Sequence, residues 1–227
     1  MSFTVVRRAA LLFFLVPGLV YGLFVSRLPA FKLSLQVNQS QLGLMLLTLG
    51  IGSVLGLMTA PILMRRTQPG RFLLTVLVLQ LVGLCFLAVC QALVAVFGVM
   101  FAIGICIGLT DVAMNVQGIA IERTFFRPVI GTLHAGYGIG GALGSIVGAL
   151  FAALGIPIWM TFLIPSIAML FPIFWAVRYT LPDSSTKEAR PSAKSTPIPG
   201  VLILYGVLVF LAFASEGACG EWGGLLL

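Results

Sequence analysis

Asp111 and Asn115 are the residues of this chain whose types and spacing point most clearly to chemistry. They lie four residues apart in the apolar stretch 104–118, and residues four apart share one face of an α-helix. A carboxylate within the hydrocarbon of a bilayer costs about 2.5–3.5 kcal/mol on insertion scales, so it usually faces a bundle interior or a water-filled cavity. The pair predicts a substrate- or proton-coupling site, and the alternative is a structural carboxylate bonded to a neighbouring helix.

Other charged side chains lie in or beside apolar stretches. Arg27 ends the first stretch, where it either snorkels to the interface, captures an anionic group or pairs with Glu216 or Glu221. Glu216 lies in the last stretch and is expected to line the same cavity as Asp111. His134, the single histidine, is either a satisfied polar residue at a helix end or a group that titrates during coupling.

The composition places the chain in the membrane. Hydrophobic residues make up 60% of the sequence and charged residues 8%, whereas a soluble domain carries about 25% charged residues. The net charge of +7 comes from short basic clusters between apolar stretches, which is typical of topology signals rather than of a nucleic-acid surface. The four cysteines lie within apolar stretches and lack metal-ligand spacing.

Seven stretches have the length of a membrane span, which needs about 20 apolar residues. With the N-terminus inside, all thirteen Lys and Arg residues except Arg27 and Lys32 fall on the inner side. This bias predicts a cytoplasmic N-terminus in a multi-pass membrane protein. Glu122, at the inner end of the fourth stretch, is expected to pair with Arg123, Arg127 or another loop cation. The predicted spans are roughly 9–29, 41–63, 72–90, 92–120, 130–154, 157–178 and 200–222.

These spans predict an all-α fold with three parts. Residues 1–178 form a six-helix bundle, residues 179–199 a polar cytoplasmic linker rich in Pro and Ser, and residues 200–227 a seventh helix. Six helices, a linker and one further helix indicate a transporter of two six-helix halves, each built from two inverted three-helix repeats. We therefore expect a truncated chain that lacks most of its C-terminal half.

The fifth span contains a run of glycines four residues apart, which lie on one helix face and allow another backbone to approach closely. Together with Gly131, the run resembles the Gly/Pro motif of proton-coupled drug antiporters, although Ser145 and Ala149 replace its Pro and a Gly. Close helix packing is the simpler interpretation. The four glycines are Gly136, Gly140, Gly144 and Gly148.

Five segments, in order along the chain, resemble the inner-membrane YbjJ-type branch of the major facilitator superfamily: 15–19, 27–30, 111–118, 133–140 and 215–222. The chain is similar, more distantly, to fucose–proton symporters. The resemblance implies twelve spans, of which this chain would supply the first seven. It also implies an acidic residue on the fourth helix, shortly before an Asn, that contributes to the cavity; Asp111 and Asn115 stand there.

The same superfamily usually has a Gly-x-x-x-Asp-Arg-x-Gly-Arg signature between its second and third helices. Here Arg66, Gly70 and Arg71 match it, whereas Arg65 replaces the acidic residue. The resemblance therefore implies a gating role for this loop, with altered charge interactions.

The sequence thus predicts a secondary active transporter of a small polar solute, coupled to protons or ions. It has no Gly-Lys-Ser/Thr phosphate loop, and we expect no enzyme activity, cofactor or metal site. The expected partners are the solute, the coupling ion, the lipid bilayer and the missing C-terminal half, and no nucleic acid. The alternatives are a non-transporting remnant of a disrupted carrier gene, a drug-efflux antiporter and a seven-helix receptor; such receptors usually have an outer N-terminus.

Overall fold

The computed structural model describes residues 1–182 and 199–226, which form helices and no strands. The chain divides into two units, Met1–Asp183 and Ser184–Leu227. Seven helices in the described ranges are long and apolar enough to cross a membrane, which confirms the all-α fold class. They are α1 Phe3–Leu35, α2 Gln39–Met64, α3 Pro69–Leu87, α4 Leu93–Phe125, α5 Ile130–Ala153, α6 Ile158–Ala176 and α7 Gly200–Leu226, and a short 3₁₀ turn, η1 Val177–Tyr179, follows α6.

The chain is therefore a multi-pass membrane protein. Its first unit leaves large apolar side chains uncovered on several helices, among them Met58 on α2, Ile146 on α5 and Phe171 on α6, which is 80% exposed. In water such a surface would drive association, but it suits the hydrocarbon of a bilayer. Of the predicted linker, residues 183–198 lie outside the described ranges.

Local signals in the sequence set the helix ends. Asn38 and Gln41 form a capping box at the start of α2, and Pro69 occupies the first turn of α3. At the start of α5, the Glu122 carboxylate accepts hydrogen bonds from the backbone N–H groups of Val129 (2.7 Å) and Ile130 (3.0 Å). Glu122 thus caps a helix instead of making the expected pair with an arginine.

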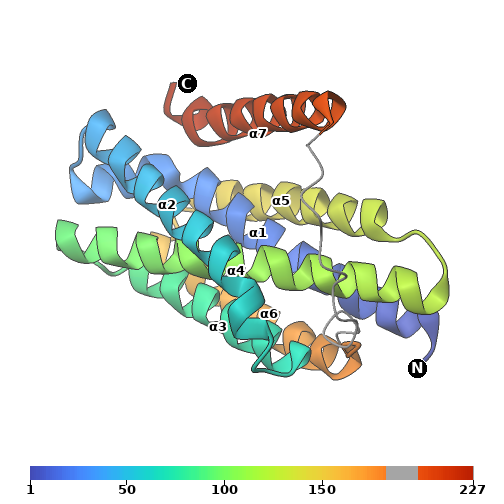
Figure 1. Cartoon of the computed structure of the whole chain (residues 1–227). Coiled ribbons are helices and arrows are strands. Elements are labelled where there is room, and N and C mark those ends of the chain that lie inside the picture. The colour runs from blue at the N-terminus through green and yellow to red at the C-terminus, as the bar shows by residue number, and fades with distance from the viewer. Residues whose placement is uncertain (183–198, 227) are drawn as a thin grey trace. The chain divides into compact units, whose positions relative to one another are not determined.

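Two pairs of helices pack with their backbones in close contact. Along the α1–α5 seam, an added methyl group at Gly18 would overlap the Tyr137 carbonyl oxygen, and one at Gly140 would overlap that of Leu15. Figure 1 shows these two helices side by side. Glycine at these positions removes the side chains that would hold the helices apart.

The α2–α4 seam is built in the same way. A methyl group at Gly52 would overlap the Phe101 carbonyl oxygen, and one at Gly104 would overlap the Leu49 carbonyl oxygen. Gly56 and Gly108 repeat these contacts one turn further along each helix.

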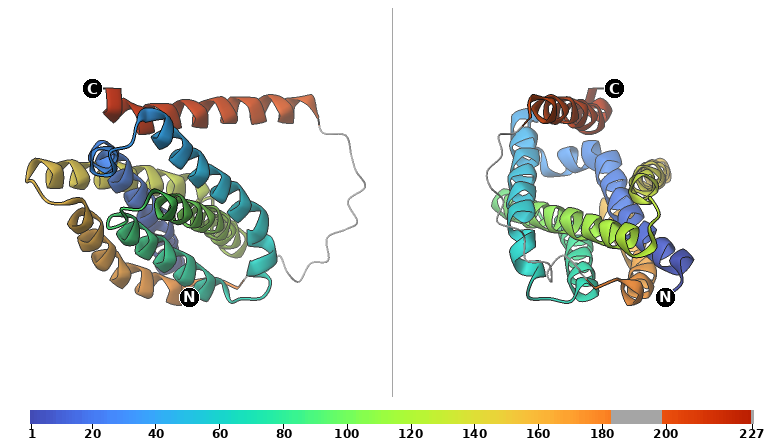
Figure 2. Two further views of the ribbon diagram at one scale, coloured as in Figure 1. Left: turned by 90° about the vertical axis from the view of Figure 1, so that its left-hand side faces the viewer. Right: turned by 45° about the vertical axis from the view of Figure 1, so that its right-hand side comes forward.

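The packing of the six helices has an exchange symmetry. Suppose that α1 is exchanged with α4, α2 with α5 and α3 with α6. The α1–α5 pair then becomes the α4–α2 pair, and the α3–α4 pair becomes the α6–α1 pair. All four of these helix pairs are in extensive contact. The α3–α6 pair, seen in Figure 2, is exchanged with itself. This is the pattern that two related three-helix repeats produce.

Candidate polar site within the bundle

Three polar side chains from α4 and α5 form a connected cluster. The Asn115 side-chain amide donates to Oδ1 of Asp111 at 3.2 Å and to the Asp111 backbone carbonyl at 2.9 Å. The Asn115 carbonyl oxygen lies 3.1 Å from Nε2 of His134. Because a carbonyl oxygen only accepts hydrogen bonds, Nε2 is the donor. Asn115 therefore bridges two groups that can each exchange a proton.

The cluster lies at the surface of the first unit, next to α1. Asp111 and Asn115 are half-buried, and His134 is exposed. Phe14, buried on α1, packs edge-on against the His134 ring, with centroids 5.1 Å apart and an interplanar angle of 74°. The polar side chains thus have an apolar wall on one side and open space on the other, an arrangement that suits a small polar solute or an ion.

Close helix packing fixes both helices that contribute to the cluster. Gly108, one turn before Asp111 on α4, lies against the backbone of α2. Gly136, two residues after His134 on α5, lies against the Leu11 side chain of α1. Helix packing this close fixes the backbone positions from which Asp111, Asn115 and His134 extend, which favours a preorganised site.

Within the described residues, Arg27 forms no hydrogen bond or ion pair with Asp111. The Arg27 side chain, only 5% exposed, donates through Nη2 to the Ile156 carbonyl oxygen at 2.9 Å, between α5 and α6. Its Nε has no partner within the described residues. Arg27 thus ties the end of α1 to the α5–α6 connection. Glu216 lies in α7, in the second unit, and its part in a cavity stays a prediction.

The remaining predicted residues lie in two places. The four glycines of α5, Gly136, Gly140, Gly144 and Gly148, all face α1. Gly70 and Arg71 form the first turn of α3, while Arg66 lies in the turn between α2 and α3. Within residues 1–182 and 199–226, none of these three loop residues forms a hydrogen bond with the polar cluster, so a gating role remains a proposal.

Sequence reasoning missed the Gly104–Gly108 pair and two hydrogen-bonded contacts. One is the bond between His134 and Asn115, which joins residues far apart in the sequence. The other involves Gln117, which is 2% exposed: its side-chain amide donates to the Leu181 carbonyl oxygen at 3.0 Å and accepts from the Leu181 N–H at 2.8 Å. A side-chain amide in a membrane helix is expected to have a hydrogen-bond partner, but only the fold shows that this partner is Leu181. Within the described residues, no three His, Cys, Asp or Glu side chains could hold a metal ion.

Comparison with curated proteins finds relatives that are named as transporters. The chain is 24% identical over 217 residues to an uncharacterized transporter of Sinorhizobium fredii (strain NBRC 101917 / NGR234). The matched region covers 94% of this chain and 57% of that transporter. It is also 24% identical over 215 residues to an uncharacterized MFS-type transporter of Yersinia pestis, covering 94% of this chain and 55% of the relative. The membrane protein MosC of Rhizobium meliloti is 24% identical over 218 residues, 94% of this chain and 52% of that protein.

The chain spans about half the length of the curated relatives it matches. No protein-family model matches it, and no solved structure does. The likeness covers nearly the whole chain and supports a transport role, whereas the relatives' names give neither substrate nor coupling ion.

Proposed function

We propose that the chain supplies the first seven helices of a secondary active transporter of the major facilitator type, in its YbjJ-type branch. The carrier would move a small polar solute across the bacterial inner membrane, with its N-terminus in the cytoplasm. The observation that carries the proposal is the Asp111–Asn115–His134 cluster on two helices of membrane length. Ionisable groups at such positions mark solute and proton paths, and the names of the relatives favour transport over signalling.

The cluster also suggests how coupling would work. Asp111 carries a negative charge when ionised, and closing a cavity around an unpaired charge is costly. Proton binding at the Asp111 carboxylate, or binding of a cation beside it, cancels that charge. Asn115 would hold the carboxyl in place, and His134 would supply a second group that can exchange a proton.

The direct test is transport into membrane vesicles that contain the protein expressed from its complete reading frame. A panel of labelled sugars, amino acids and organic acids is offered with an imposed proton gradient, with and without a protonophore. We expect at least one solute to accumulate, and the protonophore to abolish accumulation. Asp111→Asn should then lose accumulation but keep solute exchange, because the amide preserves shape while it cannot take up the proton.

Thr124→Val is the matched control on the same helix. Within the described part of the chain, the Thr124 hydroxyl donates only to the Ala120 carbonyl oxygen of its own helix, so this variant should transport at the wild-type level. Gradient-driven accumulation that survives Asp111→Asn unchanged would remove Asp111 from the coupling role. If no solute in the panel moves, the transport proposal itself loses its support.

A further inference from the structure

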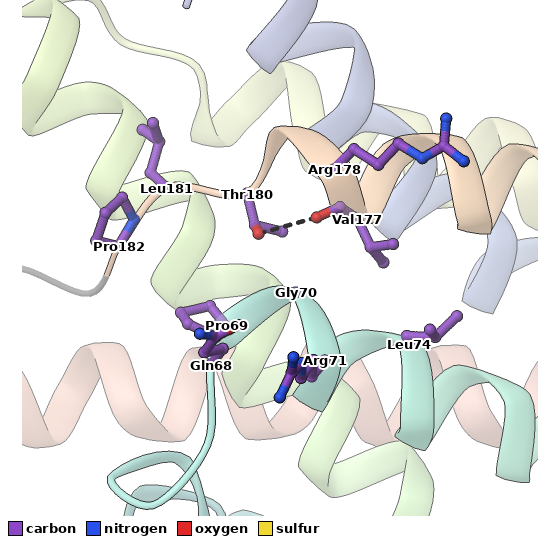
Figure 3. A pocket seen from close by; sticks show the side chains of 10 residues that line it. All are labelled: Gln68, Pro69, Gly70, Arg71, Leu74, Val177, Arg178, Thr180, Leu181 and Pro182. Carbon is purple, nitrogen blue, oxygen red and sulfur yellow. Dashed lines mark hydrogen bonds between the residues drawn. The ribbon is translucent and has the colours of Figure 1, made fainter.

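A second feature, away from the polar cluster, is a cavity of about 380 Å³ between the start of α3 and the end of α6. Figure 3 shows its two walls. Pro69, Gly70 and Arg71 line it from α3, and Val177, Arg178 and Leu181 line it from the α6 side.

The charges at this cavity are positive and have no counter-charge in the part of the chain that the structure describes. Arg71 and Arg178 are both solvent-accessible, and neither makes an ion pair or hydrogen bond with a described residue. In Figure 3 the Arg178 side chain points away from Arg71, so the two guanidinium groups lie apart on different sides of the cavity and would turn toward a shared anion. The N-terminus of α3 adds its partial positive charge, because Gln68 precedes the helix without a side-chain cap. An anion at the mouth would bring these three positive groups into one site.

The walls of the cavity are fixed before any ligand arrives. A methyl group added to Gly70 would lie 2.6 Å from the Val177 carbonyl oxygen and 2.7 Å from the Thr180 hydroxyl, so the two walls touch at this point. The Thr180 hydroxyl donates to that Val177 carbonyl at 3.1 Å. On the other side, Gln117 holds the Leu181 backbone with its two hydrogen bonds. The backbone of the site therefore needs little rearrangement on binding, and only the exposed arginine side chains have to be ordered.

The surroundings distinguish a lipid headgroup from a dissolved anion. The cavity also has the apolar side chains of Leu74, Val177 and Pro182 in its lining, and these suit glycerol and the first acyl carbons rather than a bare ion. Further along the same two helices, Val82 and Phe171 are exposed apolar side chains, as expected of a lipid-facing surface. In a bilayer, a cavity at the ends of two helices of membrane length would lie where the headgroup layer meets the hydrocarbon.

Further arginines lie where α1 begins and where α4 ends, near the Glu122 carboxylate that caps α5. Arg127 lies 5.0 Å and Arg7 5.8 Å from the centroid of the Phe3 ring, and Phe3 packs on Phe125 at the end of α4. Basic pockets between membrane helices bind anionic lipid headgroups, and each arginine near the surface contributes to that attraction.

We propose that this α3–α6 cavity binds the phosphate headgroup of an anionic phospholipid from the leaflet at the basic end. Arg71 and Arg178 hold the phosphate from opposite walls, and the α3 N-terminus adds hydrogen-bond donors. This inference does not depend on what the protein transports.

The test is native mass spectrometry of the detergent-purified chain, titrated with phosphatidylglycerol or with zwitterionic phosphatidylethanolamine. We expect the first phosphatidylglycerol to bind at least about fivefold more tightly. Arg71→Gln and Arg178→Gln should each weaken phosphatidylglycerol binding about fivefold and leave phosphatidylethanolamine unchanged. Arg65→Gln and Arg66→Gln remove equal charge nearby but outside the cavity, and should have little effect.

Two further arms keep the proposal falsifiable if a variant fails to fold. With the wild-type chain, raising the salt concentration should weaken phosphatidylglycerol binding selectively, because salt screens exposed charges. Millimolar glycerol phosphate should not displace the lipid; if it does, the site takes a soluble phosphate compound and the lipid assignment is wrong. Equal binding of the two lipids, or equal losses in the control variants, would overturn the proposal.

Discussion

The α1–α5 seam and the α2–α4 seam are held together by the same kind of contact, glycine against backbone. Each places two glycines four residues apart on both helices: Gly18 and Gly22 against Gly140 and Gly144 in one seam, and Gly52 and Gly56 against Gly104 and Gly108 in the other. In each, the glycines lie directly on carbonyl oxygens of the opposite backbone. The two seams exchange under the symmetry that relates the two three-helix groups.

The seams differ in the residues that come after the glycines. On α4, Asp111 comes three residues after Gly108, and Asn115 one turn later. On α1, the residue three after Gly22 is Val25. The same backbone packing thus supports a polar side on one helix and an apolar side on its counterpart. The repeated packing thus builds the bundle, whereas the proposed coupling would depend on polar residues that are present on only one of the two helices.

The largest expected effect comes from filling the α1–α5 seam. Gly144→Leu would place a branched side chain against the Leu19 carbonyl oxygen, so the helices must separate. We expect a loss of more than about 3 kcal/mol in the free energy of unfolding, the upper range for overpacking. Unfolding in increasing fractions of denaturing detergent measures it. Gly138→Leu, at an open position of the same helix, should stay close to wild type; equal losses in both would mean that the seam is not the cause.

A smaller change compares the two seams directly. Gly140→Ala and Gly104→Ala each add one methyl group against a backbone carbonyl, and each should cost about 1–3 kcal/mol in the same unfolding assay. The open positions Gly138 and Gly98 provide the controls, where alanine should be neutral or stabilising by up to about 1 kcal/mol. A cost in one seam and none in the other would show that the exchange symmetry does not extend to stability.

The smallest effect on stability is expected at the polar cluster. Single hydrogen bonds between membrane helices contribute about 0.6 kcal/mol on average. Asn115→Leu and His134→Leu should therefore each change the free energy of unfolding by less than about 1 kcal/mol. Their combination should show coupling in a double-mutant cycle, because they share one bond. A loss as large as that of the seam variants would assign the cluster to the structure of the bundle instead of to function.

Much of the fold can be predicted from the sequence, because hydrocarbon imposes long apolar helices and these appear as seven stretches. The glycine run of α5 indicated close packing for the same reason: a four-residue spacing fixes a helix face. The partner helix could not be predicted, since the spacing says nothing about which backbone approaches. Nor could the partners of Arg27 and His134 be predicted, because each bonds a residue that only the folded chain brings near.

The helix ends, too, could be predicted only in part from the sequence. The structure extends α1 from Phe3 to Leu35, well beyond the predicted 9–29, because membrane length sets only the apolar part of a helix. Its end falls at Gln36, which has a left-handed backbone conformation (φ 53°), and the composition of the span does not encode that position.

The central claim is that the Asp111–Asn115–His134 cluster faces a water-filled path. The most direct test replaces Cys85, Cys90, Cys106 and Cys219 with alanine, introduces Asn115→Cys or His134→Cys, and measures reaction with a membrane-impermeant thiol reagent in intact membranes. Val82→Cys, on an exposed apolar part of α3, is the control for lipid contact. We predict that cysteines at positions 115 and 134 react much faster than the one at 82. Equal protection at all three positions would contradict the claim.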